Sequence, residues 1–246
     1  AGTYQATATS GTLSGSPVTF SATALAPSAL DIVSGNPQSR GITLPLLNPL
    51  VVKLRDASNT GIPNETVTFD IITYPTGATG QSLLPTSAVT DANGQAQTAL
   101  TLGNKQGDYV VRASSNGLNA DFTATATSGA PYKVVLTGPS SVAAGEVSTA
   151  FTISIKDSFD NLTNATVNTV FSLTTTTTTT GAFYSDSGGT TSITTKTVTS
   201  GTSSATFFYK DTATGIPRIT VARTQGDVLT VDSSYVDLTV IPGGLS

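Results

Sequence analysis

Acidic and amide side chains that gather in short loops are the first candidates for chemistry in this sequence. Asp157, Asp160 and Asn161 fall within one short segment, and Asp56 and Asn59 occupy the matching positions of an earlier segment. Their oxygens are ligands that calcium prefers, but calcium binds about six to eight of them. Each loop supplies too few, and such side chains commonly bond nearby backbone N–H groups in turns. The sequence therefore favours structural turns over a metal site in both loops.

Charged residues elsewhere suggest a second chemistry, a covalent isopeptide bond between a lysine amine and an aspartate or asparagine side chain. Some Gram-positive surface modules carry such a cross-link. The bond needs both groups side by side in a dry core, and nothing in the spacing indicates that arrangement. Exposed strand charges that discourage pairing between sheet edges explain the same residues better. The residues concerned are Lys53, Lys133, Lys156, Asp70, Asp121 and Asp237.

Missing residue types exclude most familiar catalytic sites. The chain has no cysteine, methionine, tryptophan or histidine. It therefore lacks thiol nucleophiles, thiolate metal ligands and the commonest general base. Paired carboxylates can hydrolyse glycosides without these groups, but no pattern singles out such a pair. We predict a protein that is not an enzyme, with no catalytic, cofactor-binding or metal-binding residues.

Charge and composition also limit the partners. The net charge is −4, and the 11 basic residues are scattered singly, which argues against nucleic acid and anionic membrane surfaces. No apolar run of about 18 residues and no signal segment occur, so we expect no membrane insertion. Ala1 begins in mid-pattern, as in a mature or excised chain. A cysteine-free chain rich in threonine, serine and glycine is typical of bacterial or archaeal surface proteins, so we expect an extracellular or cell-surface location.

An internal repeat organises the chain. Residues 26–33 recur as residues 130–136, and both copies open with Ala-Pro. Residues 50–59 match residues 151–161, each an alternating strand followed by a basic residue, an aspartate and a polar turn. A repeat of this length indicates two copies of one module. We predict domains at residues 26–128 and 129–246.

The end of the repeat occurs a third time, at the start of the chain. Residues 107–113 lead through a turn into a strand ending near residue 126, and residues 215–222 match residues 107–113. Residues 2–8 and 18–24 follow the same pattern, joined by a Gly/Ser turn. Residues 1–25 therefore resemble the terminal hairpin of a preceding module, or a donor segment for another chain.

Short alternating runs separated by Gly, Pro, Asn and Asp indicate strands throughout. The clearest turn is Asp91-Ala92-Asn93-Gly94, in which Asn-Gly supplies two positive-φ positions and predicts a hairpin between residues 88–90 and 96–100. No segment has a sustained helical period. The predicted fold class is all-β: tandem immunoglobulin-like β-sandwiches with Greek-key type strands, preceded by an orphan β-hairpin.

The first module resembles the bacterial immunoglobulin-like repeats of invasin and intimin type adhesins. The resemblance rests on residues 51–56, 67–69, 90–96 and 107–109, and it covers residues 26–128. The second module departs from it, because residues 198–202 replace the Asp-Ala-Asn-Gly element and a threonine run is inserted. The resemblance implies a stalk, spacer, fibre or adhesive unit without specifying a ligand.

Three further features have ordinary structural explanations beside functional ones. The threonine run, residues 174–180, predicts an exposed edge strand or a long loop, with O-linked glycans as the alternative. Aromatic side chains could stack on a sugar, but core packing is the simpler prediction. The aromatic candidates are Tyr74, Phe183, Tyr184 and Tyr209, and the N-glycosylation patterns begin at Asn64, Asn161 and Asn164.

The function that fits these observations is a structural or adhesive module array of a secreted or cell-surface protein. It would act as a stalk or an extracellular fibre subunit, with strand exchange between chains through residues 1–25. The expected partners are neighbouring modules or further copies in a head-to-tail arrangement, and a host or surface ligand. The alternative is a spacer or carbohydrate-binding domain of a secreted polysaccharide-active enzyme.

Overall fold

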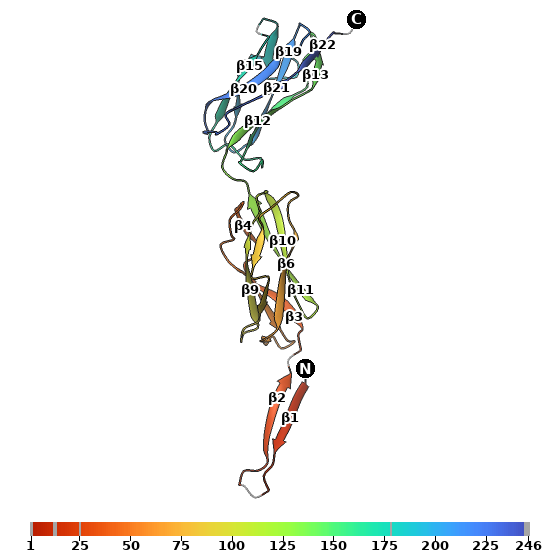
Figure 1. Cartoon of the computed structure of the whole chain (residues 1–246), viewed down its shortest axis with the longest axis vertical. Helices are drawn as coiled ribbons and strands as arrows, with labels where there is room; N and C mark the ends of the chain where they lie inside the picture. Colours follow the sequence, from red (N-terminus) through yellow and green to blue (C-terminus); the bar gives the residue numbers. More distant parts are fainter. Residues whose placement is uncertain (1, 12–13, 25, 178, 244–246) are drawn as a thin grey trace. The chain divides into compact units, whose positions relative to one another are not determined.

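The all-β prediction is confirmed by the computed structural model, which describes residues 2–11, 14–24, 26–177 and 179–243 (Figure 1). The described residues form 22 strands and no helix. None of them belongs to a helix long and apolar enough to cross a bilayer. The chain divides into two compact units, residues 1–127 (unit 1) and residues 128–246 (unit 2).

A two-stranded antiparallel sheet opens the chain. It consists of β1 (Gly2–Ala8) and β2 (Val18–Ala24), which pair with one another along their whole length. No other strand in the described part of the chain pairs with either of them. The orphan hairpin expected from the sequence is therefore present as a separate sheet.

The rest of unit 1 is a sandwich of two sheets. One sheet has the strand order β4-β11-β10-β6-β8, and the other has the order β3-β5-β9-β7. The strands are β3 (Ala29–Ser34), β4 (Gln38–Gly41), β5 (Leu50–Arg55), β6 (Thr66–Thr73), β7 (Ser82–Leu84), β8 (Ser87–Val89), β9 (Gln95–Thr101), β10 (Gly107–Ser115) and β11 (Leu118–Thr127).

Alternation along these strands explains the core of unit 1. In β10, the buried side chains of Tyr109, Val111 and Ala113 alternate with residues that are less buried. Successive side chains of a strand point to opposite faces, so this period of two gives one apolar face to the sandwich interior. Residues from both sheets, including Leu54 and Phe122, join in one buried cluster.

Unit 2 repeats this topology with more interruptions. Its main sheets have the orders β12-β14-β19-β16-β17 and β18-β15-β20-β21, and β13 pairs with β22. The strands are β12 (Lys133–Thr137), β13 (Ser141–Ala143), β14 (Phe151–Lys156), β15 (Thr169–Thr175), β16 (Gly181–Tyr184), β17 (Ser192–Ile193), β18 (Thr195–Val198), β19 (Ser204–Asp211), β20 (Arg218–Gln225), β21 (Ser233–Asp237) and β22 (Thr239–Ile241).

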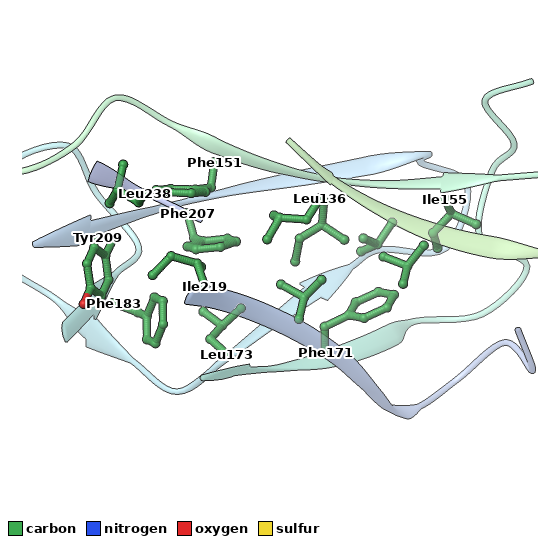
Figure 2. Packing of buried hydrophobic residues seen from close by; sticks show 14 of the residues in the cluster. Leu136, Phe151, Ile155, Phe171, Leu173, Phe183, Phe207, Tyr209, Ile219 and Leu238 are labelled. Atoms are coloured by element: carbon green, nitrogen blue, oxygen red, sulfur yellow. The ribbon is translucent and has the colours of Figure 1, made fainter. Parts of the chain in front are cut away.

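Aromatic rings fill one end of the unit 2 core (Figure 2). The rings of Phe151 and Phe207 stack with centroids 5.2 Å apart, and Phe183 meets Phe207 edge to face at 5.7 Å. Burial of each such side chain contributes about 2 kcal/mol to folding. These three phenylalanines and Tyr209 belong to one buried cluster with the aliphatic side chains of unit 2.

In both units a strand near the start pairs in parallel with the strand at the end. In unit 1 the register joins Gln38 to Ala124 and Gly41 to Thr127 across β4 and β11. In unit 2 it joins residues 141–143 to residues 239–241 across β13 and β22. Each sandwich is therefore closed by hydrogen bonds between its beginning and its end.

The turn at residues 91–94 differs from the prediction in two ways. Only Gly94 has a positive φ, +77°, and Asn93 does not. The strands on either side, β8 and β9, lie in different sheets, because β8 pairs with β6 while β9 pairs with β5 and β7. The predicted hairpin is wrong: this tight turn carries the chain from one sheet of the sandwich to the other.

The threonine run also differs from the prediction of an edge strand. Its first two members, Thr174 and Thr175, end β15, which lies between β18 and β20. The edge-strand prediction is wrong because β15 pairs with β18 on one side and with β20 on the other. The run continues into the loop before β16, where Thr178 lies outside the described residues.

Candidate functional site: the aspartate-centred loops

The loop after β14 is organised around the carboxylate of Asp157, whose exposed fraction is 1%. Oδ1 accepts the backbone N–H groups of Phe159 and Asn161, both at 2.9 Å. Oδ2 accepts the Asn161 side-chain amide and the backbone N–H of Gly129, again at 2.9 Å. Burial alone would raise the pKa of Asp157, but these donors stabilise the charged form and lower the pKa below its usual value. The carboxylate is thus fully used in holding the loop.

The loop after β5 in unit 1 has the same geometry with fewer bonds. Oδ1 of Asp56 accepts the backbone N–H groups of Ser58 and Thr60 at 2.9 and 2.8 Å. Asn59 has a φ of +65°, and Asp160 in the unit 2 loop has a φ of +68°. The preference for structural turns over metal ligation fits both loops. Within the described residues, no group of three or more acidic side chains is placed to hold a metal ion.

Unit 2 also binds the segment that enters it from unit 1. The Thr163 hydroxyl donates to the Gly129 carbonyl at 2.7 Å and accepts a hydrogen bond from the Ser128 hydroxyl at 3.1 Å. Asp157 accepts the N–H of Gly129, as described above. On the other side, the carbonyl of Thr127 accepts the Ile42 N–H within unit 1 at 2.9 Å. Thr127, Ser128 and Gly129 are therefore each hydrogen-bonded within one of the two units.

The same motif recurs in loops that sequence reasoning missed. The Asp186 carboxylate accepts the backbone N–H groups of Gly188, Thr190 and Thr191. Asp227 accepts the backbone N–H of Thr166 at 2.9 Å from a distant part of the chain. An aspartate followed after two to four residues by Gly, Thr or Asn was the available signal for Asp186, and no local signal marked Asp227. The predicted turn at Asp91 belongs to the same class, because its carboxylate accepts the N–H groups of Asn93 and Gln95.

A buried polar cluster at the end of β19 was also missed. The Asp211 carboxylate accepts hydrogen bonds from the hydroxyls of Tyr209 at 2.7 Å and Thr177 at 2.6 Å, and from the N–H of Ala213 at 3.0 Å. Its burial opposes ionisation, but the hydroxyls of Thr177 and Thr180, the Ala213 N–H and Tyr209 outweigh this and lower the pKa of Asp211 to about 2. The threonine run thus supplies donors to a core carboxylate.

The isopeptide candidates are mostly engaged in other interactions on the surface. Asp121 forms a two-bond pair with Arg112, and Asp237 forms one with Arg218. Lys133 pairs with the exposed carboxylate of Asp160 at 2.8 Å. The Lys53 amine donates to the backbone carbonyl of Asn59 at 3.1 Å. Lys156 and Asp70 appear in none of the ion pairs among the described residues.

The aromatic and glycosylation candidates do not form one site. Phe183 and Tyr209 lie in the unit 2 core, while Tyr74 is half exposed in unit 1 and Tyr184 is partly buried in unit 2. A hollow of about 630 Å³ beside β15, β16 and β17 has uncharged lining residues only. Its walls therefore hold no acid or base of their own.

The three asparagines of the glycosylation patterns lie in different surroundings. Asn64 and Asn164 are exposed. Asn161 is buried, and its amide donates to Asp157. A glycan on Asn161 would therefore break the loop that this amide helps to hold.

Comparison with known proteins gives similarity in structure only. No family model matches the chain, and no curated protein matches it.

Among solved structures, the Escherichia coli adhesin FdeC is 19% identical, with a TM-score of 0.44, over 89% of this chain and 64% of the FdeC chain. The Yersinia pseudotuberculosis adhesin InvE is 14% identical, with a TM-score of 0.35, over 86% of this chain and 58% of InvE. The D0–D1 domain of intimin is 15% identical, with a TM-score of 0.31, over 87% of this chain and 99% of that domain. The chain thus spans less than two thirds of the FdeC and InvE structures, and all three similar structures are bacterial adhesin domains of the kind that its sequence resembles.

Proposed function

We propose that this chain is a structural array of a secreted or cell-surface protein, whose two sandwiches bear tension as parts of a stalk or extracellular fibre. The observation that carries the proposal is the parallel closure of each unit, β4 with β11 and β13 with β22. Tension applied through the two ends of a unit pulls the strand near its start and the parallel strand at its end past one another. Their hydrogen bonds are then loaded together instead of one at a time.

The anchored joint supports the same role. Thr127 is bonded within unit 1, and Ser128 and Gly129 are bonded within unit 2. Tension on the chain therefore passes from the last strand of unit 1 into residues that unit 2 holds, which suits a stalk or fibre.

The buried carboxylates support a structural role over a catalytic one. Asp157 and Asp211 are both buried with lowered pKa values, and both accept hydrogen bonds from several donors of the fold. A side chain that acts as a general acid or base must itself be free to exchange a proton with the substrate. These carboxylates are committed to the fold, so their perturbed pKa values follow from loop architecture.

A finer proposal concerns location and partners. Low charge and the absence of cysteine suit a protein that works outside the cell, where its surface meets neighbouring modules, further copies or a host ligand. Head-to-tail association of the β1–β2 hairpin with a neighbouring module would extend the array. Single-molecule pulling through the two chain ends tests the load-bearing role: we expect discrete unfolding of each unit, and gradual extension without discrete steps would reject it.

A further inference from the structure

The hairpin of β1 and β2 exposes an apolar face that unit 1 does not use. Tyr4, Val18 and Phe20 are 68%, 49% and 60% exposed. Tyr4, Ala6 and Ala8 alternate along β1 with Thr3, Gln5 and Thr7, so one face is apolar and the other polar. An isolated two-stranded hairpin is marginally stable in water, and a sheet with one apolar face requires something to cover it.

The pairing of this hairpin is the same, residue for residue, as that of β10 and β11. Tyr4 faces Ala22 in the hairpin, and Tyr109 faces Ala124 in unit 1. The next inward pairs also correspond: Ala6 with Phe20, and Val111 with Phe122. The pairs that begin the two hairpins are Gly2 with Ala24 and Gly107 with Ala126. Two segments with one register and one apolar face can fill the same place in a sandwich.

In unit 1 that place is fully buried. Tyr109, Val111 and Phe122 are at most 1% exposed. The Tyr109 hydroxyl also accepts the Gly103 N–H at 3.1 Å, on the loop before β10. The same inward positions of the hairpin are exposed only because nothing faces them.

We propose that β1–β2 is the closing hairpin of a further sandwich and docks into an immunoglobulin-like partner that has strands equivalent to β3–β9 but lacks the last two. The docking is independent of the load-bearing role of units 1 and 2. The partner must pair with the outer edges of β1 and β2 and must cover the apolar face of the hairpin. In unit 1, β6 pairs antiparallel with β10 and β4 pairs parallel with β11. The partner therefore offers one antiparallel strand along residues 5–8 and one short parallel strand along residues 22–24.

A second copy of the hairpin is a poorer match than this partner. Two such hairpins placed face to face would cover Tyr4 and Phe20 but leave the outer edges of β1 and β2 unpaired. Unpaired strand edges present unsatisfied N–H and C=O groups. The incomplete sandwich satisfies both the face and the edges, as unit 1 does for β10 and β11.

The direct test supplies the missing strands from the chain itself. A second copy of residues 26–106 is placed immediately before Gly2 of the full chain, so that Gln106 precedes Gly2 as it precedes Gly107 in unit 1. We expect a third sandwich, with the β1 and β2 amides exchanging with solvent at least about a hundredfold more slowly than in the original chain. Unit 1 contains the same segment with its own hairpin and serves as the internal positive control. An added segment that stays unfolded, with hairpin amides exchanging at their original rate, overturns the proposal.

Matched variants of the extended chain distinguish the contributions of the inward and outward side chains of the hairpin to the slowed amide exchange. Tyr4→Ser and Phe20→Ser remove the inward side chains, and we expect the slowed exchange of the hairpin amides to be lost. Thr3→Ser and Thr19→Ser change the outward face and should leave the exchange slow. Protection that survives both inward changes contradicts the docking. In the original chain, sedimentation that detects a dimer abolished by Tyr4→Ser overturns the proposal in favour of a second copy.

Discussion

Aspartate carboxylates in this chain act as acceptors that gather the N–H groups of a loop. Asp157 is among the most heavily used of the loop aspartates described above, since it accepts three backbone N–H groups and one side-chain amide. Asp56, at the same position in unit 1, accepts two. The comparison of these two residues isolates the contribution of the additional bonds, including the one to Gly129.

Replacing Asp157 should therefore destabilise its unit more than replacing Asp56. Asp157→Ala leaves buried donors unsatisfied and should lower the free energy of unfolding of unit 2 by about 3 kcal/mol, against about 1.5 kcal/mol for Asp56→Ala in unit 1. Denaturant unfolding followed by NMR resonances of each unit measures both values in one molecule. Ser158→Ala, an exposed neighbour, is the control. Equal losses in the two units would contradict this account of the loop.

Asp211 should make unit 2 sensitive to acid. Its folded pKa of about 2 lies below the unfolded value of about 3.9, so its stabilising effect is complete above about pH 5 and is lost as the pH falls through 2. The loss amounts to about 2.5 kcal/mol at full protonation. Asp211→Asn removes this titration, and its unfolding free energy should vary less between pH 5 and about pH 2 than that of the parent chain. Parallel pH profiles for the two proteins would show that Asp211 is not responsible.

At the scale of elements, turns decide where the chain crosses between sheets. Gly94 lies at such a crossing, with a φ of +77°. A Cβ on Gly94 would lie 2.4 Å from the carbonyl oxygen of Leu54, so the backbone has no room for a side chain. Gly201, in the corresponding turn of unit 2, has a φ of +81° but no atom within 4 Å of its Cβ position. The first glycine serves both conformation and packing, and the second serves conformation alone.

The two glycines give a matched pair of substitutions. Gly201→Ala should cost about 1 kcal/mol, the usual penalty for a positive φ. Gly94→Ala should cost about 3 kcal/mol or more, because the clash with Leu54 adds to that penalty. Thermal unfolding of each variant, with the unaffected unit as reference, measures the difference. A cost at Gly94 no greater than that at Gly201 would mean that the close approach does not constrain the turn.

The sequence predicts strands better than it predicts their partners. Alternation over residues 50–55 and 151–156 sufficed for β5 and β14, because an apolar period of two has one structural meaning. The partners of β8 and β9 could not be predicted, since a tight turn at Asn93-Gly94 suits either a hairpin or a crossing between sheets. The Asp211 cluster was also beyond prediction, because Thr177 lies in the loop after β15 while Asp211 ends β19, and the two meet only in the folded unit.

At the scale of the whole molecule, the segment that leads into unit 2 should contribute to the stability of that unit. Thr163→Val removes the hydroxyl that holds Ser128 and Gly129 while keeping the shape of the side chain. The substitution should lower the free energy of unfolding of unit 2 by about 1 to 2 kcal/mol, because both hydrogen bonds of this buried hydroxyl are lost. Thr239→Val, an exposed control, should leave that free energy unchanged. Denaturant unfolding measures both variants, and equal stabilities would mean that the segment adds nothing to unit 2.

The load-bearing role rests on the parallel closure of each sandwich, so the most direct measurement compares pulling directions in one protein. Attachment through the chain ends loads two parallel strand pairs in shear, β4 with β11 and β13 with β22. Attachment through cysteines that replace Asp108 and Thr125 instead pulls the β10–β11 hairpin apart one hydrogen bond at a time. We expect discrete unfolding of each unit and a clearly higher unfolding force for unit 1 when it is pulled through the ends. Equal forces in the two directions would contradict it.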